Sequence, residues 1–405
     1  MINIKRYLMI KYIQNKQIRN ITAVNLDFIR EQYLSKLTSK NRLVGLIGQR
    51  GVGKTTLLLQ YLKQNFKALE YLYFSADDVY IINSSIYDIA DEFVRLGGKV
   101  IVIDEIHKYQ NWANEIKTIY DSFPELIIRF SGSSMLNILN EKFDLSRRCV
   151  ISYVKPLSFR EFLKLSENIN IPQLSFEEIL DNHNELSSTL ALENPTLYKS
   201  FLKYLQIGFY PFFIEDEIEY KNKLFNACEK IINEDIPSLN KIEYTHLSIF
   251  KKFIAKLIYA KVPFKVNIAE LCREFGVSHP TLATYLEILQ NSKLIKPIKK
   301  QSNNISKKPE KLLFGNTNLL YTYADEFGVE VDIGTVRETF FASCFDTIYY
   351  SDIGDFSVDG YIFEIGGKNK KFTQIKDTNK SYLVIDTDYT MEKNKIPLWL
   401  FGLLY

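Results

Sequence analysis

A glycine-rich stretch near residue 50 has the residue types and the spacing that bind phosphate groups. Residues 48–56 read GQRGVGKTT and match the Walker A pattern GxxxxGK[ST] in full. Its three glycines allow the backbone to curl so that N–H groups point inward at phosphate oxygens, and the helix expected next directs its positive N-terminus at the same anion. We therefore predict that a nucleotide contacts Gly48, Gln49, Arg50, Gly51, Val52, Gly53, Lys54, Thr55 and Thr56.

Two residues of this motif and two acids further along the chain have the groups that ATP hydrolysis requires. Lys54 is predicted to contact the β- and γ-phosphates, and the Thr55 hydroxyl to ligate Mg²⁺. Residues 100–105 read VIVIDE, an apolar run that ends in two carboxylates. Asp104 is predicted to hold Mg²⁺, directly or through water, and Glu105 to polarise the attacking water. The predicted cofactors are therefore ATP and Mg²⁺.

A hydroxyl and an arginine complete the predicted catalytic set. Residues 131–134 read SGSS after another apolar run, and we select Ser133 as the group that senses the γ-phosphate. An ordinary serine–glycine turn is the alternative. Arg147 and Arg148 precede the next run, where an arginine would reach the γ-phosphate of a neighbouring subunit as a finger. We favour Arg148, with a solvated basic pair as the alternative.

Short apolar runs separated by helical lengths must position these residues. Runs of this kind indicate strands buried on both faces of a parallel sheet, and right-handed crossovers place the loops after them along one edge. The run at 69–74 lies between the two motifs and predicts the class of ATPase with an extra strand there. The predicted strands are residues 43–47, 69–74, 99–103, 126–130 and 149–154.

The composition excludes several classes of protein. The 405 residues are 46% hydrophobic and 24% charged, with 17 glycines and 11 prolines, which argues against disordered and collagen-like chains. The net charge of +3 does not by itself predict a nucleic-acid binder. No apolar run reaches the ~18 to 20 residues that cross a bilayer, and Lys5, Arg6 and Lys11 interrupt the start of the chain. Four widely spaced cysteines form no CxxC pair, so we expect a cytoplasmic protein without membrane segments.

Six segments together resemble the prokaryotic AAA-type (AAA+) ATPases, and within them a group that carries a C-terminal domain of unknown function. This resemblance covers residues 40–405 and implies an ATP-hydrolysing α/β domain and a homo-oligomer. It departs from the group at SRR, where a Gly-Arg pair is usual. The segments are GQRGVGKTTLL (48–58), YFSADD (73–78), IDEIHKYQNW (103–112), SGSS (131–134), SRR (146–148) and PLSFREFL (156–163).

The C-terminal half contains a predicted helix, tight turn and second helix at residues 268–290, followed by a lysine-rich strand and loop typical of a winged helix. In a DNA-binding version His279, Thr281 and Thr284 would face a major groove. The lysines at 293, 296, 299 and 300 would then meet phosphates. Because the second helix carries little positive charge, a winged helix used for protein contact remains an equal alternative.

The final segment resembles a restriction-endonuclease-like core, in which acids and an E-x-K motif gather a divalent metal and a water. Glu338, Asp355 and Glu364 match the acids. The lysine expected two residues after Glu364 is absent because that residue is Gly366, and Lys368 is the nearest substitute. An active nuclease and a degenerate structural or binding domain therefore both remain open.

These observations predict an α/β phosphate-loop fold with a parallel sheet, followed by three smaller parts. The predicted function is an ATP-driven switch or motor, with duplex DNA, a protein partner or further copies of the chain as partners. An ATP-gated interaction scaffold with little turnover and an ATP-regulated nuclease are the alternatives. The predicted divisions are an N-terminal extension (1–40), an ATPase core (41–165), a helical lid (166–238), a winged helix (239–304) and a nuclease-like α/β domain (305–405).

Overall fold

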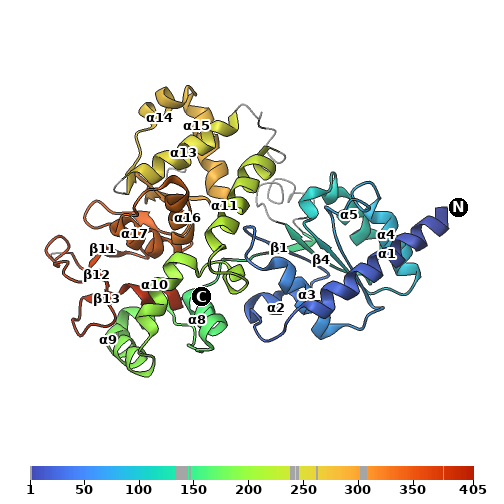
Figure 1. Ribbon diagram of the computed structural model, residues 1–405, viewed down its shortest axis with the longest axis horizontal. Coiled ribbons are helices and arrows are strands. Elements are labelled where there is room, and N and C mark those ends of the chain that lie inside the picture. Colours follow the sequence, from blue (N-terminus) through green and yellow to red (C-terminus); the bar gives the residue numbers. More distant parts are fainter. Residues whose placement is uncertain are drawn as a thin grey trace. The chain divides into compact units, whose positions relative to one another are not determined.

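The computed structural model describes residues 2–132, 145, 147–237, 242, 246–260, 263–301, 308–376 and 378–405. The chain divides into two compact units, Met1–Pro156 and Leu157–Tyr405. Figure 1 shows the first unit from blue to teal and the second from green to red.

A five-stranded parallel sheet forms the centre of the first unit, as predicted. Its strand order is β2-β3-β4-β1-β5, and every neighbouring pair is parallel. The strand between the two motifs, β2, lies at the edge of the sheet beside β3, so the predicted extra strand is present. The strands are β1 (Leu43–Ile47), β2 (Tyr71–Ser75), β3 (Val100–Asp104), β4 (Ile127–Gly132) and β5 (Cys149–Tyr153).

Helices pack on this sheet and bury its apolar side chains. All five residues of β1 and of β3 are buried, which explains why both strands read as continuous apolar runs. Gly45 is a glycine because a Cβ there would lie 2.4 Å from the Phe130 ring. The helices are α1 (Ile2–Ala23), α2 (Glu31–Leu37), α3 (Lys54–Asn65), α4 (Ile86–Arg95) and α5 (Trp112–Ser122), with a 3-10 turn η1 (Ile106–Lys108).

The N-terminal helix α1 covers the outer edge of the sheet. The Gln17 side chain accepts a hydrogen bond from Tyr73 N at 2.7 Å and donates one to Tyr71 O at 3.3 Å. These bonds satisfy backbone groups of β2 that would otherwise form an open strand edge. In the part of the chain that the structure describes, no helix, α1 included, is long and apolar enough to cross a bilayer.

The second unit begins with helices that share an aromatic core. Tyr204 and Phe209 stack with ring centroids 4.5 Å apart, and Phe159 packs on Tyr204 at 5.4 Å. Ser158 and Ser175 cap their helices in reciprocal bonds with glutamates three residues later. The elements are α8 (Phe159–Glu167), α9 (Phe176–Glu193), α10 (Leu197–Ile207), η2 (Pro211–Ile214), α11 (Tyr220–Lys230) and the π-helical turn η3 (Ile231–Asp235).

Three helices and a hairpin follow. The two helices predicted at 268–290 are present: Gly276 ends the first with a φ of 65°, and the Ser278 side chain caps the second. Strand β7 pairs antiparallel with β8, which also pairs with β6. The elements are α13 (Leu247–Tyr259), β6 (Phe264–Lys265), α14 (Ile268–Phe275), α15 (His279–Asn291), β7 (Ile295–Lys300) and β8 (Lys311–Phe314).

The last strands continue the same sheet. Because β7 also pairs in parallel with β9, the eight strands run in the order β13-β12-β11-β10-β9-β7-β8-β6. The predicted division at residue 305 lies outside the described residues, between β7 and β8, which pair with each other. The elements are α16 (Thr317–Phe327), α17 (Ile333–Ser343), β9 (Tyr349–Tyr350), β10 (Phe356–Val358), β11 (Tyr361–Gly367), β12 (Ser381–Asp386), β13 (Lys395–Pro397) and η5 (Leu398–Leu403).

Candidate nucleotide-binding site

The phosphate-binding loop links β1 to α3. Gly51 and Gly53 have φ angles of 81° and 91°, in the left-handed region that favours glycine. A Cβ on Gly48 would lie 2.5 Å from the backbone oxygen of Val154, so no larger residue fits there without moving β5. The spacing of the glycines in the sequence therefore follows from the backbone path of this loop.

Lys54 folds back over the loop that precedes it. Its side chain is buried, and its ammonium group donates to Gly48 O at 3.1 Å and to Gln49 O at 2.8 Å. Arg30, which no motif in the sequence indicates, fixes the backbone of the loop: it donates to Val52 O at 3.4 Å and to Lys155 O at 2.8 Å. The Lys54 ammonium group thus lies against the backbone oxygens of the loop, and the Arg30 guanidinium group fixes its backbone at Val52.

Three hydroxyl groups converge on the buried carboxylate of Asp104. Thr55 donates to its Oδ2 at 2.6 Å and Tyr73 at 3.1 Å, while Ser131 donates to Oδ1. The donors come from α3, β2 and β4, which surround the end of β3. Burial, and then the charge of Asp104, raise the pKa of Tyr73 well above its ordinary value. This hydroxyl therefore keeps its proton and remains a donor.

Glu105 stands at the sharp turn after β3. Its φ of 51° is unusual for a residue with a side chain. Its backbone N–H lies 3.1 Å from Ser131 Oγ and 3.1 Å from Asp104 Oδ1, which fixes the turn. The carboxylate lies 3.6 Å from Nε2 of the buried His107. The turn thus places the Glu105 carboxylate just beyond the end of the strand, against an imidazole.

The structure brings together four of the predicted residues, Lys54, Thr55, Asp104 and Glu105, at one end of the parallel sheet. Ser133 lies outside the described residues. Within the SGSS segment, the described hydroxyl that contacts Asp104 is that of Ser131, whose position at the end of a buried run was the available signal. Tyr73 was missed because a tyrosine in an apolar run usually indicates packing.

The predicted arginine finger contacts its own chain. Arg148 Nε donates to Asp121 Oδ1 at 2.9 Å, and Nη2 donates to Oδ2 at 3.1 Å. This two-point contact holds the guanidinium on the surface of the first unit, while Arg147 is exposed. A role for Arg148 on a neighbouring subunit would require the bond to Asp121 to break.

The residues predicted for DNA contact divide into two groups. His279 and Thr284 are exposed at the start of α15. Lys296, in contrast, donates to the backbone oxygens of Ala342, at 2.7 Å, and Phe345, and Lys300 pairs with Asp352 at 2.7 Å. Lys296 and Lys300, which were expected to meet phosphates in a DNA-binding version, therefore have partners within the protein.

The acids predicted in the last segment do come together, with a different lysine. Lys311 Nζ contacts Glu338 Oε2 and lies 3.5 Å from Asp355 Oδ1. Burial, and then the charge of Asp355, raise the pKa of Glu338. The ammonium group that contacts Glu364 belongs to Lys370, at 2.6 Å, and not to the expected Lys368. Lys368 is nearer to Glu364 in the sequence, but Lys370 is the lysine whose side chain folds back onto this carboxylate.

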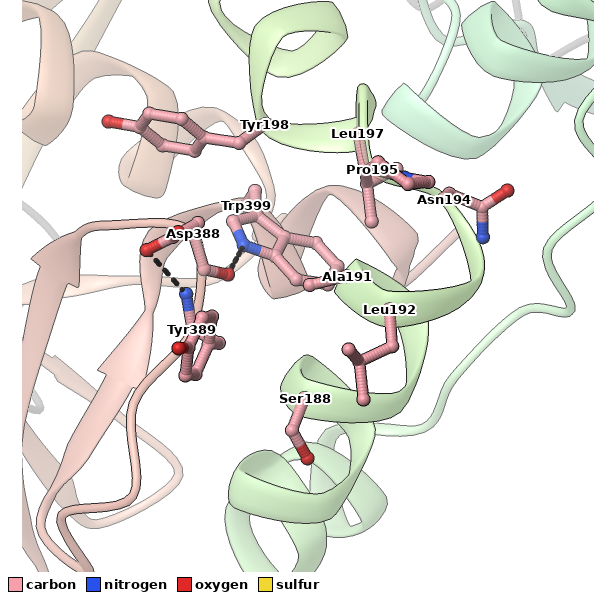
Figure 2. A pocket seen from close by; sticks show the side chains of 10 residues that line it. All are labelled: Ser188, Ala191, Leu192, Asn194, Pro195, Leu197, Tyr198, Asp388, Tyr389 and Trp399. Carbon is pink, nitrogen blue, oxygen red and sulfur yellow. Dashed lines mark hydrogen bonds between the residues drawn. The ribbon is translucent and has the colours of Figure 1, made fainter.

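A separate cavity of about 340 Å³ lies in the second unit (Figure 2). Its lining is mainly apolar and includes Trp399, whose ring N–H donates to Asp388 O at 2.7 Å. Asp388 in turn accepts from Tyr389 N at 3.0 Å. The cavity contains none of the predicted site residues.

Two parts of the chain match known domain families. Residues 40–163 match the family model of an AAA domain, and residues 198–328 match a domain of unknown function (DUF8612). An uncharacterized protein of Methanocaldococcus jannaschii is 31% identical over 270 residues. That match spans 63% of this chain and 56% of the relative, so this chain covers little more than half of the relative's length.

Two solved structures are also similar. PCH-2 of C. elegans is 16% identical with a TM-score of 0.24, over 40% of this chain and 44% of that one. AMPPCP-bound DnaA from Aquifex aeolicus is 16% identical with a TM-score of 0.26, over 65% and 86%. TM-scores this low do not establish a common fold. The AAA-domain match does cover both motifs, and residues 40–163 therefore form a nucleotide-binding domain of the AAA ATPase type.

Proposed function

We propose that this chain is an ATP-hydrolysing switch in which residues 48–56 bind the nucleotide and Glu105 positions the attacking water. One observation carries the proposal: the Thr55 hydroxyl lies 2.6 Å from the Asp104 carboxylate where the phosphate loop meets the end of β3. The AAA-domain match over the same residues supports it.

The donor set at this position suits magnesium. Hydroxyl and carboxylate oxygens are the ligands that Mg²⁺ prefers, and Thr55 and Asp104 would hold it. Tyr73 and Ser131 keep the carboxylate in one orientation through their hydrogen bonds. When bound, Mg²⁺ supplies positive charge that stabilises the phosphate oxygens during transfer.

Lys54 and Glu105 perform the remaining steps. The Lys54 ammonium exchanges its two carbonyl contacts for phosphate oxygens, which bind a cation more strongly because they carry charge. Glu105 orients the water for in-line attack on the γ-phosphate. His107, 3.6 Å from Glu105, positions this carboxylate. We propose Ser133 as the γ-phosphate sensor and Arg148 as a finger toward a second copy, with a serine turn and a surface ion pair as their alternatives.

The C-terminal half is the part of the chain that we propose changes position when ATP is hydrolysed. We infer that α13, α14, α15 and the β7–β8 hairpin form a winged helix, which ATP turnover repositions together with the strands that continue its sheet. Duplex DNA and a protein are the two candidate partners. The internal bonds of Lys296 and Lys300 reduce the charge available for phosphates, and this observation favours a protein partner.

The test is magnesium-dependent ATP hydrolysis with and without duplex DNA. Wild type, Lys54→Ala and Glu105→Gln are compared with two exposed controls, Lys63→Ala at the far end of α3 and Glu125→Gln before β4. We expect turnover in the wild type and the controls and a loss of at least 100-fold in the other two variants. If the wild type bound ATP without hydrolysing it, the role of Glu105 in hydrolysis would be refuted and only the proposed binding of the nucleotide would stand.

The assay with duplex DNA distinguishes between DNA and a protein as the partner of the C-terminal half. Turnover that rises with duplex DNA, and less so at higher salt, would assign the C-terminal half to DNA. Turnover indifferent to DNA would assign it to a protein partner.

A further inference from the structure

Arg30 connects two segments of the first unit that are far apart in the sequence. It is the residue directly before α2, and it is 5% exposed. Its Nη1 donates to Val52 O in the phosphate-binding loop at 3.4 Å and to Lys155 O at 2.8 Å, and its Nη2 donates to Pro156 O at 3.2 Å. One guanidinium group therefore bridges the loop and the residues that follow β5.

Residues 154–156, called the linker below, lead from β5 to the boundary between the two units, because the first unit ends at Pro156. A second side chain from α2 also holds the linker: the hydroxyl of Tyr33 accepts from Lys155 N at 2.9 Å. The ring of Tyr33 packs against the Arg30 guanidinium group, 4.7 Å from its centre. The beginning of α2 thus fixes the linker through two neighbouring side chains.

The residue directly after the linker is anchored within the second unit. Leu157 N donates to Phe209 O at 2.8 Å, and Leu157 O accepts from the hydroxyl of the buried Tyr204 at 2.8 Å. Only one peptide bond separates Pro156, whose carbonyl Arg30 holds, from this anchored residue, and the proline ring restricts rotation of the backbone at that point. A displacement of the linker is therefore transmitted along the chain to Leu157.

The geometry of the guanidinium group makes the loop and the linker depend on each other. This group is planar and its N–H donors have fixed directions, so Arg30 cannot follow both segments if they move apart. A buried donor that loses its acceptor costs free energy. The bond to Val52 O is the longest of the three at 3.4 Å, so a rearrangement of the loop changes this bond at the least cost.

The loop and the linker also approach each other at a second point, where the loop begins. Val154 N donates to Ile47 O at 2.7 Å, and a Cβ on Gly48 would lie 2.5 Å from Val154 O. This contact holds the first residue of the linker against β1 and the start of the loop. Arg30, in contrast, holds the last two residues of the linker, which lie next to the second unit.

We propose that Arg30 is a positioning residue whose planar guanidinium group couples the phosphate-binding loop to the linker, so that a nucleotide bound at the loop restricts the linker and the residue that follows it. This inference rests on the proposed binding of ATP by residues 48–56. It adds a route by which occupancy of that site reaches the C-terminal half. Arg30 acts through the backbone oxygen of Val52 and not through the nucleotide itself.

The test is hydrogen–deuterium exchange of the full chain, with and without saturating AMPPNP and Mg²⁺. The backbone N–H groups of Lys155 and Leu157 report on the linker, and those of residues 48–56 report on the loop. In the wild type we expect the nucleotide to slow exchange in both segments by about fivefold. Arg30→Met should keep the protection of the loop and lose that of the linker. Lys36→Met, which changes an exposed lysine of α2, is the control and should behave as the wild type.

The outcomes separate this inference from the proposed function. If the loop alone is protected in the wild type, nucleotide binding stands and the coupling is refuted, whereas protection of neither segment refutes both. A linker that is still protected in Arg30→Met would also overturn the proposal, and would assign the coupling to the contact between Gly48 and Val154.

A second variant decides the question if Arg30→Met does not fold. Arg30→Lys keeps the positive charge but lacks the planar group that holds several acceptors at once. We expect the nucleotide to protect its loop as in the wild type and its linker by less than half as much. Full protection of the linker in Arg30→Lys would refute the role of the guanidinium group.

Discussion

Thr55 donates its hydroxyl hydrogen to Asp104 over 2.6 Å, which joins the first turn of α3 to the end of β3. The two residues are far apart in the sequence and belong to different motifs. Their contact brings the phosphate-binding loop and the strand end together in one cluster of side chains. It also predicts that the two side chains act on the same ion.

Removing the Thr55 hydroxyl should therefore weaken the binding of magnesium at this site. We expect Thr55→Ala to lower the rate of ATP hydrolysis by about 10- to 100-fold, because one oxygen ligand is lost. Thr55→Ser should retain most of the rate, since it keeps the hydroxyl. A magnesium titration of both variants is the measurement, and equal rates in the two would exclude the hydroxyl as a ligand.

Tyr73 is expected to act through Asp104. Tyr73→Phe removes a single hydrogen bond of 3.1 Å and keeps the ring, so the free energy of unfolding should fall by only about 1 kcal/mol. The magnesium concentration at half-maximal rate should rise, because the carboxylate is held less firmly. Urea unfolding and the magnesium titration are measured together. A loss of stability with an unchanged magnesium dependence would assign Tyr73 to packing alone.

The sequence was sufficient for the parts of the site that depend on local spacing. The glycines at 51 and 53 and the acids after an apolar run predicted a parallel sheet with an extra strand between the two motifs, and the structure has both. It also places the Thr55 hydroxyl 2.6 Å from Asp104. These features follow from the backbone path of a loop and from the ends of neighbouring parallel strands meeting at one edge.

The features that the sequence did not reveal depend on side chains that fold back or reach across. Lys370 contacts Glu364 because Gly366 leaves room for it, and no pattern along the strand shows this. Arg30 reaches the phosphate loop from a helix start more than twenty residues earlier. Lys296, which would meet a phosphate in the DNA-binding alternative, donates to the end of α17, because β7 continues into the C-terminal sheet.

The buried thiol of Cys228 should be unreactive in the folded protein. Burial raises its pKa to about 12, so at pH 8 only about one molecule in ten thousand carries the reactive thiolate. Cys149, which is half-buried, should be alkylated by iodoacetamide much earlier. Mass spectrometry of time points gives the rate at each site. Labelling of Cys228 at the rate of Cys149 would show that α11 opens readily.

Asp78 should make the docking of α1 depend on pH. It accepts bonds from Lys16 at 2.5 Å, from Tyr80 N at 2.9 Å and from Tyr12 at 3.1 Å. Burial raises the pKa of Asp78, but these three bonds outweigh it and hold the pKa below the ordinary 3.8. Because the folded pKa is the lower one, the stabilisation is complete above pH 3.8 and is lost as pH falls through the folded value.

Replacing Asp78 by asparagine tests whether the charge of Asp78 stabilises the folded protein. We expect Asp78→Asn to reduce the free energy of unfolding by about 2 kcal/mol at pH 7, since a buried group loses its charge-assisted bonds. The difference between wild type and variant should stay constant down to pH 5 and shrink below pH 4, where wild-type Asp78 begins to be protonated. Urea unfolding of both proteins at each pH gives the difference directly.

The exposed neighbour provides the control, because Asp77→Asn should change the free energy of unfolding by less than about 0.5 kcal/mol. A difference for Asp78→Asn that grew toward low pH would mean that the charge of Asp78 opposes folding.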